Sequence, residues 1–397
     1  MASNNSFTPY TPEYWSKRMQ VIREEKVVYS VLGNMEEKST LSDGDTVNRP
    51  LKTSPYVTDY TKGTDVTTQD LSGTQESLTV NQFKTAPFYI DDIEQMQSRY
   101  DLNNTFADEA GMRMEEYIDA DFLSEVTNAT NTVDDGDIGG TSGNAAVISP
   151  SNITKVFTSA QKYLNQENVG MEGRYAVISP TGHQVLMEKL DGKDSALGDS
   201  TGKNGNVGKY MGFDLHVSNN TYYTATWTPA DNPSDGDTVT INGVTFTFET
   251  GTIDGNAEVN VGGDLGATLD NLAAAINGTG TAGTDYSALT HDQRSKLVGA
   301  TATNDSDTHI DLTFDGGGEV SVAASESADP WSAQKTYWMF GQKGAVDVVV
   351  QKEADVKFKE HPDRRGQNVI PLMVYGIKTF SEGADALVSV EIDGSDF

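Results

Sequence analysis

A long run of apolar residues at helical spacing begins near Asp91. Three acids, Asp91, Asp92 and Glu94, come first, and the helix dipole favours anions in a first turn. Apolar residues then recur three or four positions apart, as on one helix face: Ile93, Met96, Tyr100, Ala107, Ala110, Met114, Tyr117 and Ile118. The pattern predicts one helix from Asp91 to about Val126, roughly 50 Å long at 1.5 Å per residue.

Shorter helices and strands alternate after this helix. Ser151 is a suitable cap for a helix in which the apolar residues share one side: Ile153, Val156, Phe157, Ala160 and Leu164. The apolar run 175–179 predicts a short buried strand, Pro180 begins a third helix, and 213–217 predicts another strand. This order of elements is typical of an α+β domain.

The C-terminal part of the chain predicts further strands. Residues 346–358 and 369–380 are rich in apolar and β-branched side chains, and a charged turn at 361–366 joins them. The segment 384–392 predicts a last strand.

Two N-terminal segments lack the apolar residues needed to fold alone. Residues 1–25 predict a polar arm followed by a short helix. The stretch 43–85 is rich in Thr, Ser, Asp and Gly, with only scattered bulky residues. A long excursion of this composition has strand propensity but little to bury, so we expect it to find its partner elsewhere.

Residues 226–330, called the acidic segment below, carry 17 acids and 2 bases. The segment therefore contributes −15 of the net charge of −31 and leaves −16 for the rest. Asn242-Gly243 predicts a two-residue hairpin in which Ile241 faces Val244 and Val239 faces Phe246. These signals predict a small β-rich domain inserted into the parent domain.

Two further elements are predicted inside the acidic segment. Asp264 can cap a helix that stops at Asn277-Gly278, with apolar residues on one stripe: Leu265, Leu269, Leu272 and Ile276. A second hairpin would pair 310–314 with 320–322 across the turn 315–319.

Composition narrows the possible functions. The chain has 397 residues, enough for two or three domains, 36% of them hydrophobic and none of them cysteine. Disulfides and thiolate chemistry are thus absent. Its mean hydropathy is −0.48, and no stretch has the roughly 18 apolar residues of a spanning helix. A net charge of −31 excludes general electrostatic affinity for nucleic acid. A container for DNA is still allowed, because its wall need not bind the cargo.

A search for chemistry yields no catalytic, cofactor-binding or metal-ligating residues to which we commit. The five histidines have no pair at i, i+4 spacing on one helix face: His183, His216, His291, His309 and His361. Nucleophile-elbow and phosphate-loop motifs are missing. Two sets of aspartates offer the oxygens that calcium prefers: Asp231, Asp235 and Asp237, and Asp305, Asp307 and Asp311. Neither matches a calcium-loop motif, so solvated turn residues are the favoured interpretation, and no enzyme is predicted.

Two runs of residues resemble a known family. Residues 44–50 (Gly-Asp-Thr-Val-Asn-Arg-Pro) with Val57-Thr58-Asp59-Tyr60 resemble the start of the extended loop of tailed-phage major capsid proteins. Residues 83–92 (Phe-Lys-Thr-Ala-Pro-Phe-Tyr-Ile-Asp-Asp) resemble the return of that loop into the spine helix. The order of the predicted elements also resembles this family, which has the Hong Kong 97-like fold.

The resemblance implies an α+β Hong Kong 97-like capsid fold with an inserted domain. Its parts would be an N-terminal arm, an extended loop, a peripheral domain with the spine helix, an axial domain and the insert. The implied boundaries are 1–28 for the arm, 43–85 for the loop, 86–147 and 346–380 for the peripheral domain, 148–225, 331–345 and 381–397 for the axial domain, and 226–330 for the insert.

The implied function is that of a major capsid protein, assembled in a host cytoplasm and located in the virion. It would associate with itself in hexamers and pentamers, enclose double-stranded DNA without sequence-specific binding, and meet scaffolding, portal and decoration proteins, but no membrane. Arg49, Arg364 and Arg365 would donate ion pairs between subunits. Nothing marks Lys52 or Lys62 as reactive, so the family's occasional lysine–asparagine crosslink is not carried over.

Two alternatives remain open on the sequence alone. An encapsulin-like compartment shell has the same fold and would hold a cargo enzyme. An acidic surface protein that binds a glycan through the insert would instead lose its activity when 226–330 is deleted. If the chain is instead a major capsid protein, we expect the insert to be displayed on the outside of the shell.

Overall fold

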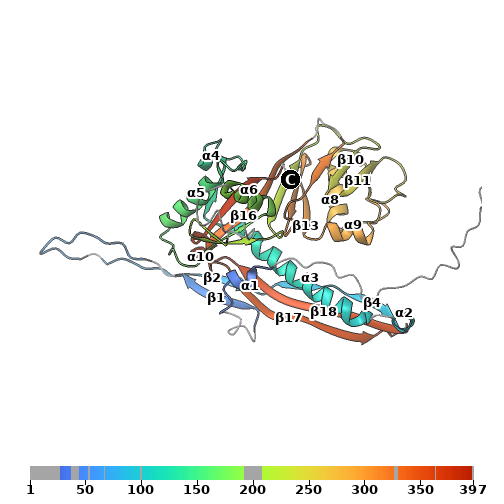
Figure 1. The fold of residues 1–397 in the computed structure, drawn as a ribbon, viewed down its shortest axis with the longest axis horizontal. Helices are drawn as coiled ribbons and strands as arrows, with labels where there is room; N and C mark the ends of the chain where they lie inside the picture. Colours follow the sequence, from blue (N-terminus) through green and yellow to red (C-terminus); the bar gives the residue numbers. More distant parts are fainter. Residues whose placement is uncertain are drawn as a thin grey trace, which may run out of the picture.

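The computed structural model describes residues 27–36, 44–51, 54–66, 68–98, 101–191, 208–325, 330–362 and 364–395. The predicted arm and its helix therefore lie almost wholly outside the described residues. Figure 1 shows a long, narrow sheet with one helix along it, a larger body above it, and a thin loop projecting to one side.

The narrow sheet is built on the two long C-terminal strands. β17 (Asp347–Glu360) and β18 (Gly366–Lys378) pair antiparallel, which confirms the predicted strand pair. β3 (Gln82–Thr85) and β4 (Phe88–Asp91) pair with β18 at its other edge. α3 (Leu102–Ser124) packs on one face of this sheet, and a shared core joins them: Met114, Ile118, Phe122, Val348, Met373 and Tyr375.

The prediction of a single helix from Asp91 to Val126 is wrong, because this stretch forms two helices, α2 and α3. α2 (Asp92–Gln97) begins at the expected acids but ends at Ser98, whose backbone is extended with φ −73° and ψ 143°. α3 begins afresh after Asp101, whose side chain accepts a hydrogen bond from the Asn104 backbone N–H. Short polar side chains such as Asp and Asn bond to nearby backbone groups and so favour helix ends. The spacing of apolar residues alone does not reveal that polar side chains end one helix and begin another here.

The larger body contains a nine-stranded sheet. Its central strand β16 (Trp331–Gln342) pairs with β6 (Arg174–Ile178), β9 (Tyr222–Trp227) and β19 (Leu387–Asp393). α5 (Ile153–Gln166) and α6 (Pro180–Leu190) confirm the predicted helices. Rings from three elements pack edge to face at 5.1–6.2 Å: Phe157, Phe213 and Phe340.

Two boundaries in this body differ from the expectation. α5 follows Asn152, not Ser151, because the Asn152 side chain accepts from the Ser149 N–H and closes the preceding turn. The last strand starts at Leu387 instead of 384, since the short helix α10 (Ser381–Asp385) precedes it. Local hydrogen bonding before each element therefore decides where α5 and β19 begin.

The acidic segment confirms its first hairpin and its helix. β10 (Thr238–Ile241) and β11 (Val244–Glu249) pair in the predicted register, Ile241 opposite Val244 and Val239 opposite Phe246. α8 (Leu265–Asn277) is capped by Asp264, which accepts from the Ala267 N–H at 2.9 Å, and ends at Gly278 with φ 68°.

The second predicted hairpin of the acidic segment is wrong. β14 (His309–Phe314) pairs with β13 (Ala300–Asp305) and with β9, while β15 (Val322–Ala324) pairs with β10. Gly316 and Gly318, with φ of 75° and 61°, carry the chain away from β14 instead of turning it back. β13 consists of small and polar residues, so no hydrophobic pattern marks it.

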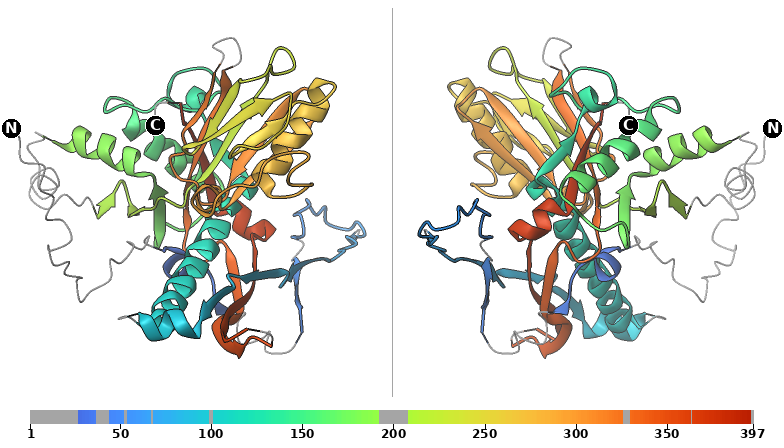
Figure 2. Two further views of the ribbon diagram at one scale, coloured as in Figure 1. Left: turned by 90° about the vertical axis from the view of Figure 1, so that its right-hand side faces the viewer. Right: turned by 90° about the vertical axis from the view of Figure 1, so that its left-hand side faces the viewer.

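Most residues of one hydrophobic core lie in the acidic segment, but Tyr223, Ala225 and Trp331 of the flanking strands belong to it too, and β13 and β14 continue the nine-stranded sheet. The two ends of the segment lie together, because Trp227 and Trp331 are directly opposite partners on neighbouring strands. Figure 2 shows its yellow and orange elements on one side of the red strands and the green helices on the other. Whether it folds alone stays a prediction.

The remaining elements are short. They are α1 (Tyr29–Leu32), β1 (Thr46–Leu51), β2 (Thr74–Thr79), a 3-10 helix at Glu125–Asn128, β5 (Asn131–Val133), α4 (Asp135–Ile138), β7 (Lys209–Tyr210), β8 (Phe213–Val217), β12 (Glu258–Asn260) and α9 (His291–Lys296).

A glycine pair tests how tightly α6 packs. A Cβ at Gly182 would overlap the ring of buried Trp338, whereas a Cβ at Gly111 on α3 would meet no atom within 4 Å. We expect Gly182→Ala to lower the free energy of unfolding by about 1–3 kcal/mol. Gly111→Ala should raise it by about 0.5–1 kcal/mol through helix propensity. Urea unfolding measures both, and equal effects of the two variants would contradict the packing described.

Candidate assembly surfaces

The extended loop leaves the body as two strands that do not join the larger sheets. β1 and β2 pair antiparallel, with Thr46 opposite Thr79 and Leu51 opposite Thr74. Beyond this short ribbon the chain projects far from the rest of the molecule (Figure 1). The predicted loop at 43–85 therefore has a fixed base and a projecting end.

Arg49 fixes the base of the loop. Its guanidinium donates to both carboxylate oxygens of Asp347, at 3.0 and 2.8 Å, and lies 4.2 Å from the ring centroid of Phe380. Asp347 is buried and also accepts from the Asn34 side chain at 2.8 Å. Bidentate pairs of this kind orient both partners.

Further contacts hold β2 against the end of β18. The Lys378 ammonium donates to the Ser77 carbonyl at 2.9 Å, and Ser381 donates its hydroxyl and backbone N–H to Glu76. These bonds from Ser381 hold the pKa of the partly exposed Glu76 carboxyl below its usual range. A small apolar cluster completes the contact: Leu78, Val80, Val349 and Phe380. The base of the loop is thus bonded to the end of β18 and packed against the narrow sheet.

The projecting end carries large apolar side chains that are exposed to solvent. Val57 is 99% exposed, and four others in the same stretch are more than half exposed: Tyr56, Tyr60, Val66 and Leu71. Clusters of exposed apolar side chains on an otherwise polar surface mark interaction sites. This end of the loop is therefore a candidate contact surface.

The arginines expected to bridge subunits divide into two kinds. Arg49 is bound to Asp347 and Glu382 of its own chain, and a further ion pair from it to a neighbouring subunit stays a prediction. Arg364 and Arg365 are exposed at the β17–β18 turn, and their role stays a prediction. Lys62 is exposed on the loop, while Lys52 lies outside the described residues.

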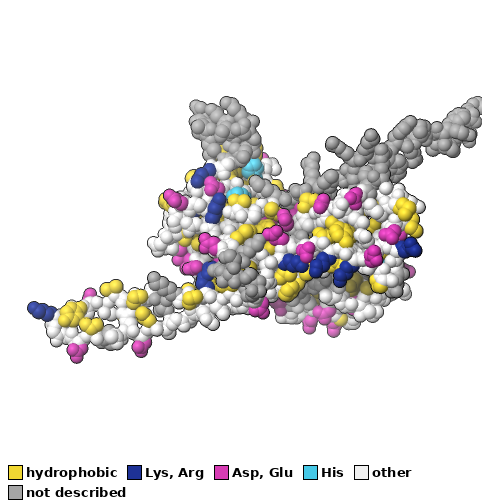
Figure 3. Space-filling view, turned by 90° about the horizontal axis from the view of Figure 1, so that it is seen from below, with side chains coloured by type: hydrophobic (Ala, Val, Ile, Leu, Met, Phe, Trp, Pro, Cys, Tyr) yellow, Lys and Arg dark blue, Asp and Glu magenta, His cyan; other side chains and the backbone are white. Residues whose placement is uncertain are grey.

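The outer face of the narrow sheet, opposite α3, combines lysines with apolar side chains. Lys352, Lys357 and Lys359 on β17 stand opposite Val374, Ile370 and Asn368 on β18. Next to them Phe83 is 67% exposed. Seen from this side, dark-blue side chains form a row beside yellow ones (Figure 3). The row is notable in a chain whose net charge is −31.

Asp119 joins three parts of the chain at the inner end of α3. The fully buried carboxylate accepts hydrogen bonds from the backbone N–H groups of Val28 and Tyr29, at 2.6 and 2.8 Å. It also accepts from the Asn220 side chain at 3.0 Å. Burial raises the pKa of Asp119, while these three bonds lower it. The residue ties the described N-terminal end to α3 and to the loop before β9.

Asp121 and Asp315 form a pair of carboxylates whose charges interact. Burial, and then the charge of Asp121, raises the pKa of Asp315 to about 6. Burial also raises the pKa of Asp121, although a hydrogen bond from the Tyr375 hydroxyl and the charge of Lys84 oppose the shift. The charged form of Asp315 is therefore unfavourable in the folded subunit.

This shift predicts a pH dependence. Between pH about 4 and about 6 the folded state holds a proton on Asp315 that the unfolded state has lost, so stability falls as pH rises through this window. Asp315→Asn should remove this loss and stabilise the subunit by on the order of 1 kcal/mol at neutral pH. Thermal unfolding of both proteins across the window checks it, and a difference independent of pH would contradict it.

The aspartates considered as calcium ligands separate in the structure. Asp235 accepts from the Thr250 N–H and hydroxyl, and Asp237 accepts from the Ser234 N–H, as turn residues do. Asp305 and Asp311 do come together, but with His309 instead of Asp307. Sequence spacing missed His309, because the β13–β14 pairing was not predicted.

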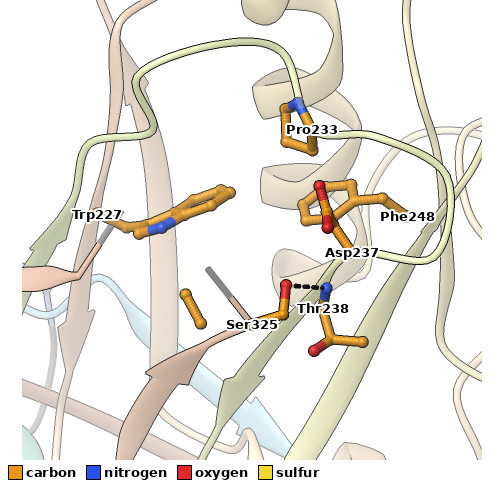
Figure 4. Close-up of a pocket in the computed structure, with 7 residues that line it drawn as sticks. Trp227, Pro233, Asp237, Thr238, Phe248 and Ser325 are labelled. Carbon is orange, nitrogen blue, oxygen red and sulfur yellow. Dashed lines mark hydrogen bonds between the residues drawn. The ribbon is translucent and has the colours of Figure 1, made fainter. Parts of the chain in front are cut away.

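A pocket in the acidic segment bears on the glycan-binding alternative. Trp227, Phe248 and Pro233 line it, and the Thr238 N–H donates to the Ser325 hydroxyl at 2.9 Å across it (Figure 4). Trp227 and Phe248 stack on each other at 5.9 Å and are 3% and 0% exposed. Neither ring offers an open face on which a sugar could stack.

Comparison with known proteins identifies the family. Residues 74–262 match the model of a family described as phage capsid protein. The structure of a protein of Mycobacterium phage Che8 has the same arrangement of the chain, with a TM-score of 0.58, 17% identity and 98% of each chain covered. Over residues 74–262 the chain thus matches the phage capsid protein family, and along its whole length it has the fold of a phage protein. Among curated proteins, none matches it.

Two other solved structures resemble this chain. The capsid structure of cyanophage P-SCSP1u has a TM-score of 0.54 at 12% identity and covers 98% of this chain and 94% of that one. The acidic stable capsid structure of Helicobacter pylori bacteriophage KHP30 has a TM-score of 0.54 at 10% identity, with 99% of each chain covered. The likeness confirms the mixed α and β Hong Kong 97-like fold.

The family match and the shared fold together support a shell-forming structural protein of the virion and do not favour a cellular compartment shell. Among the described helices none is long and apolar enough to cross a membrane.

Proposed function

We propose that this capsid protein closes an icosahedral shell around double-stranded DNA by laying its extended loop across a neighbouring subunit, without catalysing a reaction. The observation that carries the proposal is the exposed apolar end of the loop, headed by Val57 at 99% exposure, on a base that Arg49 holds rigidly. An apolar surface presented on a rigid support loses little entropy when a partner covers it.

The charge of the subunit sets a condition for assembly. Copies of net charge −31 repel one another, and salt screens this repulsion over about 10 Å at 0.1 M. The lysine row of β17 offers each copy a surface that attracts its acidic neighbours. We expect buried apolar contacts to supply most of the association energy, because each exposed ion pair contributes only about 0–1 kcal/mol.

The proposal extends to the partners. Hexamers and pentamers of this chain would form the shell, with separate scaffolding and portal proteins and a decoration protein as candidates. Sedimentation of the purified subunit across salt and concentration, with and without the scaffolding protein, tests it. A subunit that stays monomeric under every condition would defeat the proposal.

We further propose that the acidic segment is displayed on the outside of the shell and is not needed to build it. Its ends meet at Trp227 and Trp331, so a short turn can replace residues 229–329. With Trp227 and Trp331 changed to threonine to limit exposed apolar surface, we expect the shortened chain still to form particles. Density for the segment on the DNA side of a particle, or loss of particles from a folded shortened chain, would oppose it.

A further inference from the structure

Three titratable side chains converge at the tip of the β13–β14 hairpin, away from the surfaces described above. Asp305 ends β13 and is the direct partner of His309 across the turn, and Asp311 lies two residues further along β14. Side chains two residues apart on a strand point to the same face, so all three share one side of the sheet. One ligand atom from each lies within 4.8 Å of the other two.

The spacing of these atoms does not fit hydrogen bonds. His309 Nε2 lies 3.7 Å from Asp305 Oδ2 and 3.6 Å from Asp311 Oδ2, beyond the roughly 3.2 Å limit for N–H···O bonds. A tetrahedral ion with ligands at about 2.1 Å holds them about 3.4 Å apart, since the edge is about 1.63 times the bond. The observed distances are close to this edge.

Each of the three groups is oriented by a hydroxyl on its outer side. Ser306 donates to Asp305 Oδ1 at 2.8 Å, and Thr226 on β9 donates to Asp311 Oδ1 at 2.8 Å. The Thr308 hydroxyl lies 2.9 Å from His309 Nδ1. When Nδ1 carries the proton for this bond, Nε2 keeps a free lone pair. Such outer partners are typical of metal-binding histidines and carboxylates.

We propose that Asp305, His309 and Asp311 bind a divalent transition-metal cation of the zinc type, with water completing its coordination. Two carboxylates balance the charge of the ion, and an imidazole nitrogen favours zinc, cobalt or nickel over calcium and magnesium, which prefer oxygen ligands. The side chains of His309, Asp305 and Asp311 are 26%, 58% and 44% exposed, so an ion can reach them. The bound ion would link the hairpin tip to β9 through Thr226.

Calorimetric titration of the full chain with Zn²⁺, in excess Mg²⁺ to occupy the general acidic surface, tests the proposal. We expect one saturable site per chain, with Co²⁺ giving visible absorption bands at the same stoichiometry and Zn²⁺ raising the melting temperature. His309→Gln should abolish the site, and Thr226→Val should weaken it about 10-fold or more. His291→Gln, on α9 in the same segment, is the matched control and should bind like the wild type.

Asp305→Asn, at the exposed hairpin tip, replaces His309→Gln if that variant fails to fold. The competing interpretation is a protonated His309 held between two carboxylates without an ion. Wild-type protein without a saturable Zn²⁺ site, or a folded His309→Gln variant that binds Zn²⁺ as tightly as wild type, would overturn the proposal.

Discussion

Replacing Val57 by aspartate is expected to stop shell assembly while leaving the subunit folded. Val57 is 99% exposed in the single chain, so the substitution removes no contact within it. When the loop lies across a neighbouring subunit, the variant lacks the buried valine side chain, whose burial is worth about 1.5–3 kcal/mol. It would also bury the aspartate charge, at further cost. Because every copy carries the change, the penalty is repeated at each contact of the shell.

Thr58→Asp provides a matched control for this variant. It adds the same charge to an exposed polar residue one position along the loop. Electron microscopy and sedimentation should show few particles for Val57→Asp and many more for Thr58→Asp, with equal melting temperatures of the unassembled subunits. Particles from Val57→Asp in wild-type yield would refute the role given to the loop.

The elements that sequence predicted well are those whose signals are local. Asn242-Gly243 dictates a two-residue turn, and the turn then sets which strand residues face each other, so the register of β10 and β11 was predictable. The ends of α8 were predictable for the same reason, since Asp264 and Gly278 bear the caps themselves.

The elements that failed depend on competition or on distant strands. The break at Ser98 arises because Asp101 caps a new helix, although the apolar spacing continues past it. β13 was missed because its own residues give no pattern, and its place next to β14 is fixed by pairing across the sheet. Without β13, the partner of β14 was assigned to the next apolar residues along the chain.

The candidate surfaces divide in the same way. The extended loop was predictable, because a segment with too little apolar surface to fold alone needs a partner. Its anchor was not, since Arg49 and Asp347 are almost 300 residues apart and only the folded chain brings them together. The sequence indicated Asp305 and Asp311 as possible metal ligands. His309 lies beside them only because β13 pairs with β14. Spacing along a chain therefore finds ligands on one helix more readily than ligands across a hairpin.

Loss of the Asp119 carboxylate is expected to destabilise the subunit more than any other single change proposed for its interior. Asp119→Ala leaves the N–H groups of Val28 and Tyr29 and the amide of Asn220 buried without this acceptor. A buried donor left unpaired costs about 1–3 kcal/mol, so the free energy of unfolding should fall by on the order of 3–5 kcal/mol. Urea unfolding of the unassembled subunit measures this loss.

The variants around Asp119 separate the hydrogen bonds from the charge. Asp119→Asn keeps one oxygen for Val28 and Tyr29 and places its amide against Asn220, which can turn its own oxygen toward it. This variant should therefore lose less stability than Asp119→Ala. Asp108→Ala removes an exposed acid from the same helix and should change stability by less than about 0.5 kcal/mol. If Asp119→Ala were no worse than Asp108→Ala, the carboxylate would not hold the N-terminal end, α3 and the loop before β9 together.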